Sequence, residues 1–271
     1  MNLMQAAILG LVEGLTEFLP VSSTGHLILT SYALGLKDSS GAFEVVIQAG
    51  AILSVIWHYR AKFFESLRGF FAREASWLRF WGLILTAFSP AVVLGLALGN
   101  WIHAHLFGVA PVIFALIVGG IAMILVERRL PKVSAQHATL GKDFPSTYLE
   151  ALKIGFLQCL ALWPGTSRSM ATILGARLLG FSPKGAAEFS FWLAIPTLIG
   201  ASVYESWKYR DELFASPDAL STLAVGIVIS FLSGLIVIRA FLGFLQRHSL
   251  EAFGWYRVSL GFILAACWLV L

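Results

Sequence analysis

The sequence predicts an all-α integral membrane protein with six transmembrane helices plus two re-entrant helical hairpins, arranged as an inverted repeat. The first observation is composition: of 271 residues, 58% are hydrophobic and 13% are charged, and the mean hydropathy is +0.81. A water-soluble domain needs more charge to cover its surface, so the bilayer is the expected solvent. The other two observations are long apolar segments and breaks within two of them. No polar linker divides the chain, which indicates a single membrane domain over residues 1–271.

Six segments are apolar over a length that approaches the roughly 20 residues a hydrocarbon core requires. They are residues 42–60, 78–100, 109–127, 185–205, 219–241 and 252–270. Two further apolar segments, 3–36 and 147–180, are each interrupted near the middle by a proline in a Ser/Thr-rich turn. The interruptions are Pro20-Val-Ser-Ser-Thr24 and Pro164-Gly-Thr-Ser167. Because each half is too short to cross, we expect two re-entrant hairpins.

Positive charge predicts the orientation of these segments. Lys and Arg gather in loops 58–79 and 128–147 and before the last segment, whereas loop 101–108 has none. Cytoplasmic loops carry this excess, so both termini are expected outside. Loop 206–218 fits less well, because Lys208 and Arg210 would then lie outside. The residues counted as cytoplasmic are Arg60, Lys62, Arg68, Arg73, Arg79, Arg128, Arg129, Lys132, Lys142, Arg239, Arg247 and Arg257.

The two hairpins also resemble each other in sequence. Residues 6–13 align with 151–158, and after a one-residue slip Pro20 aligns with Pro164 and Ser23 with Ser167. We therefore divide the chain into repeat 1, about residues 1–127, and repeat 2, about residues 147–271. Three crossings separate the copies, and an odd number inverts the second one. In inverted repeats, broken helices form a site near the membrane midplane.

Glu13 and Glu17 are one helical turn apart, so their carboxylates share a helix face. Two ionised carboxylates at membrane depth are costly unless one takes a proton or a cation lies between them. A divalent cation with hard oxygen ligands, Mg²⁺ or Ca²⁺, meets this need and keeps positions for phosphate oxygens. The alternative is that both acids face a polar loop near the surface.

Ser22, Ser23 and Thr24 are favourable N-caps, so the second half of hairpin 3–36 is expected to begin there with free N–H groups that suit a phosphate. Ser23 is a candidate nucleophile if His26 takes its proton. The alternative is that the serines only cap the helix and His26 bonds a carbonyl.

The second hairpin contributes a turn rich in anion-binding groups. Gly165 permits close backbone approach, Ser167 and Ser169 offer hydroxyls, and Arg168 is a permanently charged planar fork suited to a phosphate. An arginine within an apolar hairpin needs an anion, which is either a glutamate or a phosphate ligand. Thr172 lies one turn further and is expected to line the same cavity.

These motifs resemble a known family. Glu13-Gly-Leu-Thr-Glu17, Pro-Val-Ser-Ser-Thr-Gly-His26 and Pro164-Gly-Thr-Ser-Arg-Ser-Met-Ala-Thr172 closely resemble the signatures of the bacterial undecaprenyl-pyrophosphate phosphatases of the bacitracin-resistance type. The resemblance covers the whole chain in length and segment order. It implies hydrolysis of a polyprenyl pyrophosphate to the monophosphate lipid carrier of cell-wall synthesis, dependence on a divalent cation, and a site facing the outer (periplasmic) side of the cytoplasmic membrane.

Together these observations predict a mechanism. A cation held by Glu13 and Glu17 would bridge pyrophosphate oxygens, Arg168 and the half-helix N-termini would stabilise the transferred phosphoryl group, and Ser23 or a water would attack. His26 would move the proton. The prenyl tail would stay among the membrane lipids.

Two rival functions remain. The first is a transporter or flippase of an anionic lipid or small anion, because broken helices in inverted repeats are typical of transporters. The second is a phosphohistidine lipid phosphatase, which needs a second histidine soon after Arg168, whereas the next one is His248. The net charge of +4 lies in loop clusters and indicates no nucleic-acid partner. The sequence leaves open which group is the nucleophile, which divalent ion binds and how long the polyprenyl chain is. It also leaves open the oligomeric state, for which a homodimer is one candidate.

Overall fold

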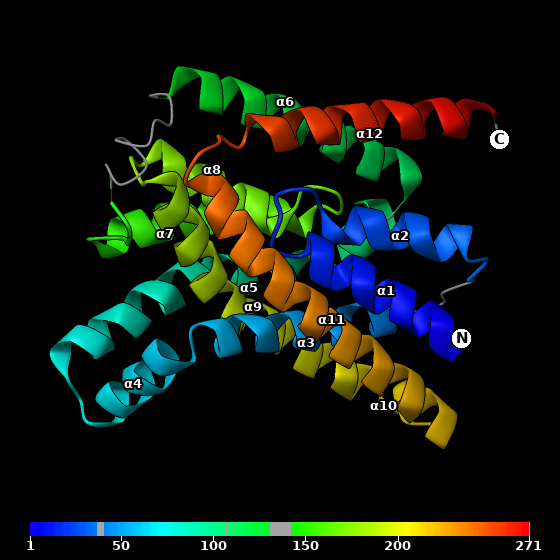
Figure 1. Ribbon diagram of the computed structural model, residues 1–271, viewed down its shortest axis with the longest axis horizontal. Helices are drawn as coiled ribbons and strands as arrows, with labels where there is room; N and C mark the ends of the chain where they lie inside the picture. Colours follow the sequence, from blue (N-terminus) through cyan, green and yellow to red (C-terminus); the bar gives the residue numbers. More distant parts are fainter. Residues whose placement is uncertain (37–40, 107, 131–141, 271) are drawn as a thin grey trace.

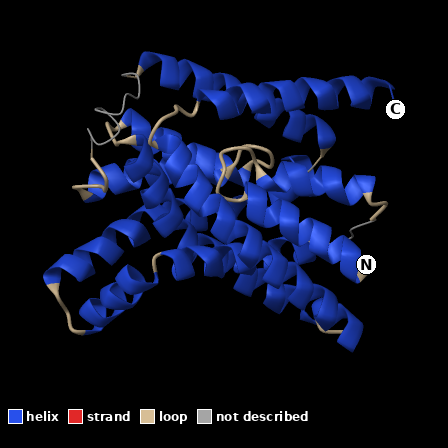
Figure 2. Cartoon of the chain, viewed as in Figure 1, coloured by secondary structure: helices blue, strands red, loops and turns tan. Residues whose placement is uncertain are grey.

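A computed structural model describes residues 1–36, 41–106, 108–130 and 142–270. Within these ranges the regular secondary structure is helical, and short loops join the helices (Figures 1 and 2). The elements are α1 (Leu3–Thr16), α2 (Ser23–Ala33), α3 (Ala42–His58), α4 (Arg60–Phe71), α5 (Ala75–Leu106), α6 (Val109–Arg129), α7 (Tyr148–Gln158), η1 (Cys159–Leu162), α8 (Arg168–Leu178), α9 (Pro183–Lys208), α10 (Arg210–Leu213), α11 (Pro217–Leu245) and α12 (Glu251–Val270).

A helix occupies each of the six segments predicted to cross the membrane. In the described part of the chain, four of these helices are long and apolar enough to cross: α5, α6, α9 and α11. If the bent pair α3 and α4 is counted as one broken span, the number rises to five. The chain is therefore a multi-pass, all-helical membrane protein. The helix α12 is not among these four, so the finer arrangement of six spans plus two re-entrant hairpins stays a prediction.

Both hairpin segments are broken at the predicted turns. In the first, α1 ends at Thr16 and α2 begins at Ser23; in the second, α7 and η1 are followed by α8 from Arg168. We call residues 17–22 the first elbow and residues 163–167 the second elbow. The N-caps are Ser22 and Ser167, whose φ angles of 74° and 73° are nearly equal and left-handed. The structure thus matches Ser22, not Ser23, to Ser167, and no slip is needed up to this point.

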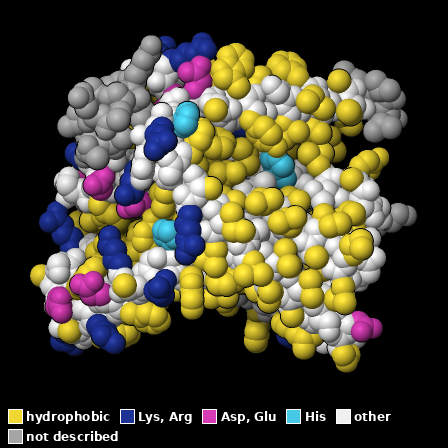
Figure 3. All heavy atoms as spheres, in the orientation of Figure 1, with side chains coloured by type: hydrophobic (Ala, Val, Ile, Leu, Met, Phe, Trp, Pro, Cys, Tyr) yellow, Lys and Arg dark blue, Asp and Glu magenta, His cyan; other side chains and the backbone are white. Residues whose placement is uncertain are grey.

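The segments predicted as loops contain more helix than expected. Most of segment 58–79 is α4, which turns by 85° from α3, and α5 continues to Leu106 through most of segment 101–108. The N-terminus and the end of α12 lie at one end of the molecule and α4 at the other (Figure 1). On the face in Figure 3, Lys and Arg side chains lie along the side of the molecule that carries α4, while hydrophobic side chains cover most of the remainder. Lys132 lies outside the described residues.

Helices from the two halves of the chain pack against each other. The first half of each hairpin contacts a long helix of the other half: α1 packs on α11, and α7 on α5. Two glycines permit this approach. A Cβ at Gly10 would lie 2.4 Å from the Gly226 carbonyl oxygen, and one at Gly155 would lie 2.4 Å from that of Ala87. Further contacts join α3 with α9 and α6 with α12.

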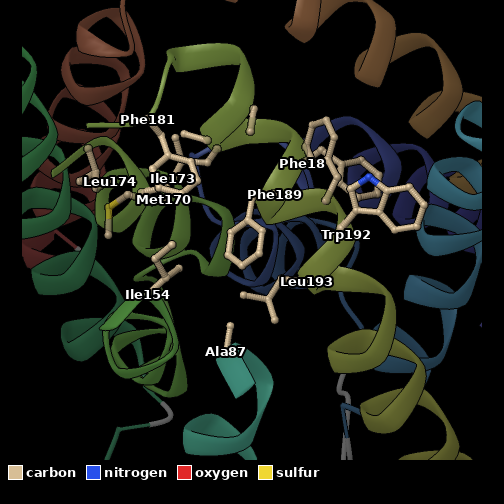
Figure 4. Packing of buried hydrophobic residues seen from close by; sticks show 14 of the residues in the cluster. Phe18, Ala87, Ile154, Met170, Ile173, Leu174, Phe181, Phe189, Trp192 and Leu193 are labelled. Carbon is tan, nitrogen blue, oxygen red and sulfur yellow. The ribbon is translucent and has the colours of Figure 1, made fainter. Parts of the chain in front are cut away.

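The main core lies where α8 and α9 meet α5, α7 and α11. Figure 4 shows part of it, with Phe18 of the first elbow near Trp192 and Phe189 of α9. Phe18 and Phe191 are in edge contact at 5.3 Å between ring centroids. Because Phe18 follows Glu17 directly, the apolar core holds the first elbow in place.

Candidate active site

A cavity of about 180 Å³, lined by both polar and apolar residues, lies between the two elbows. Its wall includes the first turns of α2 and α8, so both half-helix N-termini face it, an arrangement that favours an anion. The sequence-predicted residues in the wall are Glu17, Ser22, Ser23, Thr24, Gly165, Ser167 and Arg168. The structure therefore brings together groups from both hairpins.

An ion pair joins the two hairpins across this cavity. The Arg168 Nη2 atom lies 2.8 Å from Glu17 Oε1, and the two side chains are only 9% and 5% exposed. Arg168 Nη1 also donates to the backbone oxygen of Ser190 at 2.9 Å. The guanidinium is thus fixed by an anion on one side and a carbonyl on the other, with its Nε lacking a hydrogen-bond partner.

The hydroxyl of Ser23 donates its hydrogen bond to Glu17 rather than to His26. Its Oγ lies 2.6 Å from Glu17 Oε2. Each Glu17 oxygen therefore accepts one hydrogen bond, Oε1 from Arg168 and Oε2 from Ser23. This geometry makes the Glu17 carboxylate the nearest proton acceptor for Ser23.

The ring of His26 is held between a backbone oxygen and a tyrosine. Its Nδ1 lies 2.7 Å from the Ser22 carbonyl oxygen, and its Nε2 lies 2.7 Å from Tyr256 Oη. A carbonyl only accepts, so Nδ1 carries the proton in the neutral ring and Nε2 accepts from the tyrosine hydroxyl. The His26 and Tyr256 rings also stack, at 5.8 Å between centroids.

Glu13 is buried without a hydrogen-bond partner. It is 0% exposed, both of its carboxylate oxygens are unpaired, and it lies within electrostatic range of Glu17, Glu44 and Arg168. An isolated buried carboxylate is costly, so a proton or a cation must neutralise it. Among the described residues, no group of three or more His, Cys, Asp or Glu side chains forms a metal-binding cluster. Mg²⁺ suits this sparse donor set, because one or two carboxylates plus substrate phosphates commonly hold it.

Four of the predicted residues hold the elbows and the helices that follow them in place. Ser22 and Ser167 cap α2 and α8 by accepting from the N–H groups of Gly25 and Met170. Ser169 is fully buried and lies 2.8 Å from the Leu19 carbonyl oxygen, which ties α8 to the first elbow. Thr172 is also buried, with its Oγ1 at 2.7 Å from Ser190 Oγ, and is absent from the cavity wall.

A buried arginine that sequence reasoning missed ties the elbows together. The charge pattern predicts Arg257 as a cytoplasmic charge, but its side chain is 0% exposed. Its Nη1 lies 3.3 Å from the Pro20 oxygen and its Nη2 lies 2.9 Å from that of Gly165. Each carbonyl is two residues before the capping serine, so Arg257 contacts the same position in both elbows. A third bond reaches Ala115 of α6 at 3.0 Å.

Comparison with known proteins agrees with the motifs. The chain matches the family described as bacitracin resistance protein BacA over residues 6–263. It is 48% identical to the undecaprenyl-diphosphatase of Pseudomonas putida strain F1 over 265 residues, which cover 97% of this chain and 93% of the relative. The undecaprenyl-diphosphatase of Pseudomonas aeruginosa strain UCBPP-PA14 gives the same values. Undecaprenyl-diphosphatase 1 of Stutzerimonas stutzeri strain A1501 is 48% identical over 266 residues. The matched region includes both elbows and Arg257.

Proposed function

Because the chain belongs to the family of the bacitracin resistance protein BacA, we propose that it hydrolyses undecaprenyl pyrophosphate to undecaprenyl monophosphate and inorganic phosphate. The observation that carries this function is the contact of Ser23, Glu17 and Arg168 at the wall of one cavity. A nucleophile, a proton acceptor and a fixed cation are the groups that phosphoryl transfer requires. Binding or transport of an anion alone needs no hydroxyl held on a carboxylate.

The contacts suggest a role for each side chain. Ser23 Oγ, or a water in its place, attacks the terminal phosphorus, and its proton passes to Glu17 Oε2, which already accepts it in a hydrogen bond. The bond from this phosphorus to the bridging oxygen breaks, and the monophosphate lipid leaves with the electron pair. Arg168 and the N–H groups at the starts of α2 and α8 stabilise the charge on the transferred group. If Ser23 attacks, water then releases phosphate from the serine.

We assign His26 a positioning role. Its ring contacts Ser22 and Tyr256 rather than Ser23, so it holds the first elbow where α2 begins. Ser22 is strained, with φ at 74°, and a bond to its carbonyl oxygen helps to keep this conformation.

The proposed holder of a divalent cation is Glu13, which lies one helical turn before Glu17 and is not itself in the cavity wall. The unpaired oxygens of this buried acid support the proposal, and Glu17 could join as a ligand, because each of its oxygens accepts one hydrogen bond and keeps a second lone pair. The cation would neutralise negative charge on the pyrophosphate when bound. The sparse donor set favours Mg²⁺ over Ca²⁺, which takes six to eight oxygens.

The setting proposed for this reaction is the bacterial cytoplasmic membrane, with the cavity facing the outer side. The basic residues along the side that carries α4, opposite the N-terminus, support this orientation, because cytoplasmic segments carry such charge. The first half of each hairpin packs on a long helix of the other repeat, α1 on α11 and α7 on α5, and this symmetry supports the inverted repeat. A prenyl tail would remain among the membrane lipids while the headgroup enters between the elbows.

The test is phosphate release from undecaprenyl pyrophosphate by purified protein in detergent, with and without Mg²⁺. A transporter or flippase only moves its ligand across a membrane, and detergent provides no two-sided membrane. Such a protein would therefore release no phosphate in this assay. We expect turnover by the parent and losses on the order of 10²-fold or more for Glu17→Gln and Arg168→Ala, because each removes charge that stabilises the transition state. The control is Arg128→Ala, which removes an exposed pair with Glu251 and should leave turnover unchanged. Normal turnover by both site variants would refute the assignment.

A further inference from the structure

A buried glutamine in the cavity wall has no partner in the protein. Gln158 is the last residue of α7, directly before η1, and it is only 1% exposed. Neither its Oε1 nor its Nε2 makes a hydrogen bond. It lines the same cavity as Ser23 and Arg168.

This arrangement costs free energy. Leaving a buried amide unpaired costs the amide its hydrogen bonds to water, and most buried side-chain polar atoms in proteins have a partner. An apolar residue of similar size would avoid the cost at this position. A side chain kept at such a cost on the wall of a ligand cavity indicates that the bound ligand supplies the missing partner.

The position of Gln158 in its hairpin points to the nature of that ligand. Counted back from the capping serines Ser22 and Ser167, Gln158 holds the place that Glu13 holds in the first hairpin. Both side chains are buried and unpaired. A carboxylate suits a cation, whereas the isosteric amide offers two N–H donors and no charge, which suits an anion.

We propose that Gln158 is a ligand of the pyrophosphate headgroup and that its Nε2 donates to a phosphate oxygen. The inference rests on the proposed function and adds a binding residue to it. The two equivalent positions then have complementary roles, with Glu13 binding the cation and Gln158 binding the anion. A glutamate at 158 would instead place a negative charge against the substrate.

The test combines steady-state kinetics with thermal melting in detergent for the parent, Gln158→Leu and Gln158→Glu. Melting is repeated with inorganic pyrophosphate and Mg²⁺ as the probe. The matched control is Ser230→Ala, which also removes a fully buried, unpaired polar atom but lies outside the cavity wall. We expect Gln158→Leu to melt no lower than the parent, because it removes an unsatisfied amide, yet to raise KM by about 10- to 100-fold.

For Gln158→Glu we expect a still larger rise in KM, and for both variants a smaller melting shift with pyrophosphate than the parent shows. Ser230→Ala should keep the parent KM and the parent response. An unchanged KM in Gln158→Leu would overturn the inference, as would lower melting with an undiminished response to pyrophosphate. These outcomes require an active parent, so a parent that releases no phosphate would refute the proposed function instead.

Discussion

The ion pair between Arg168 and Glu17 can be tested against a closely matched pair elsewhere in the molecule. Arg177 lies 3.1 Å from Glu127, with side chains 8% and 2% exposed, and it also donates to a backbone oxygen, that of Phe181. Arg168 has the same kinds of partner: one buried glutamate and one carbonyl. The two arginines therefore differ mainly in their contact with the cavity.

The perturbation is Arg168→Met compared with Arg177→Met. Each leaves a buried carboxylate without its cation, which costs about 3–5 kcal/mol of unfolding free energy. For a chain of this size we expect both melting temperatures to fall by roughly 10 °C. The two variants should differ in catalysis: kcat should fall on the order of 10²-fold or more in Arg168→Met, and less than about twofold in Arg177→Met.

The assay is thermal melting in detergent together with kcat per folded protein, measured well below both melting temperatures. Equal losses of kcat in the two variants would show that destabilisation alone explains the effect. That result would refute a direct role of Arg168 in charge stabilisation.

Two further predictions concern residues around the elbows. Arg257→Lys keeps the charge but loses the planar fork that reaches Pro20 and Gly165 at once. We therefore expect kcat to fall by about tenfold, with faster proteolysis near the elbows as the second readout. An unchanged kcat would show that the contacts of Arg257 with the elbows are dispensable. Glu13→Gln removes an unpaired buried carboxylate, so the melting temperature of this variant should equal or exceed that of the parent. The Mg²⁺ concentration for half-maximal turnover should rise by about tenfold or more. An unaltered Mg²⁺ requirement would show that Glu13 is not a ligand of the cation.

The sequence is most informative where local chemistry decides the structure. Prolines and serines locate both breaks, because Pro20 and Pro164 oppose helix continuation and a serine caps the helix that follows. The helix α4 is not predicted because its apolar and charged residues are mixed, a pattern that fits a helix lying at an interface as well as a loop. The sequence alignment pairs Ser23 with Ser167, whereas the structure pairs Ser22 with it, since Ser22 and Ser23 are both good caps in sequence and only the backbone distinguishes them.

Side-chain partners far apart in the chain could not be predicted in the same way. The motifs place Glu17 and Arg168 in one site, but nothing local shows that Ser23 donates to Glu17 rather than to His26. The contacts of Arg257 depend on how α12 packs on α6, which no spacing rule specifies. A role for Gln158 could not be predicted because a single glutamine forms no sequence motif. What indicates its role is the lack of hydrogen-bond partners, which only the folded chain shows.

The place of Arg257 in the last helix has a consequence for biosynthesis. A ribosome completes both hairpins before it synthesises α12, so the hydrogen bonds of Arg257 to Pro20 and Gly165 form only after α12 has been made. A nascent or prematurely terminated chain would carry every residue of the cavity wall and still lack this tether. Maturation of the enzyme is therefore tied to the docking of α12 against α6 and the two elbows.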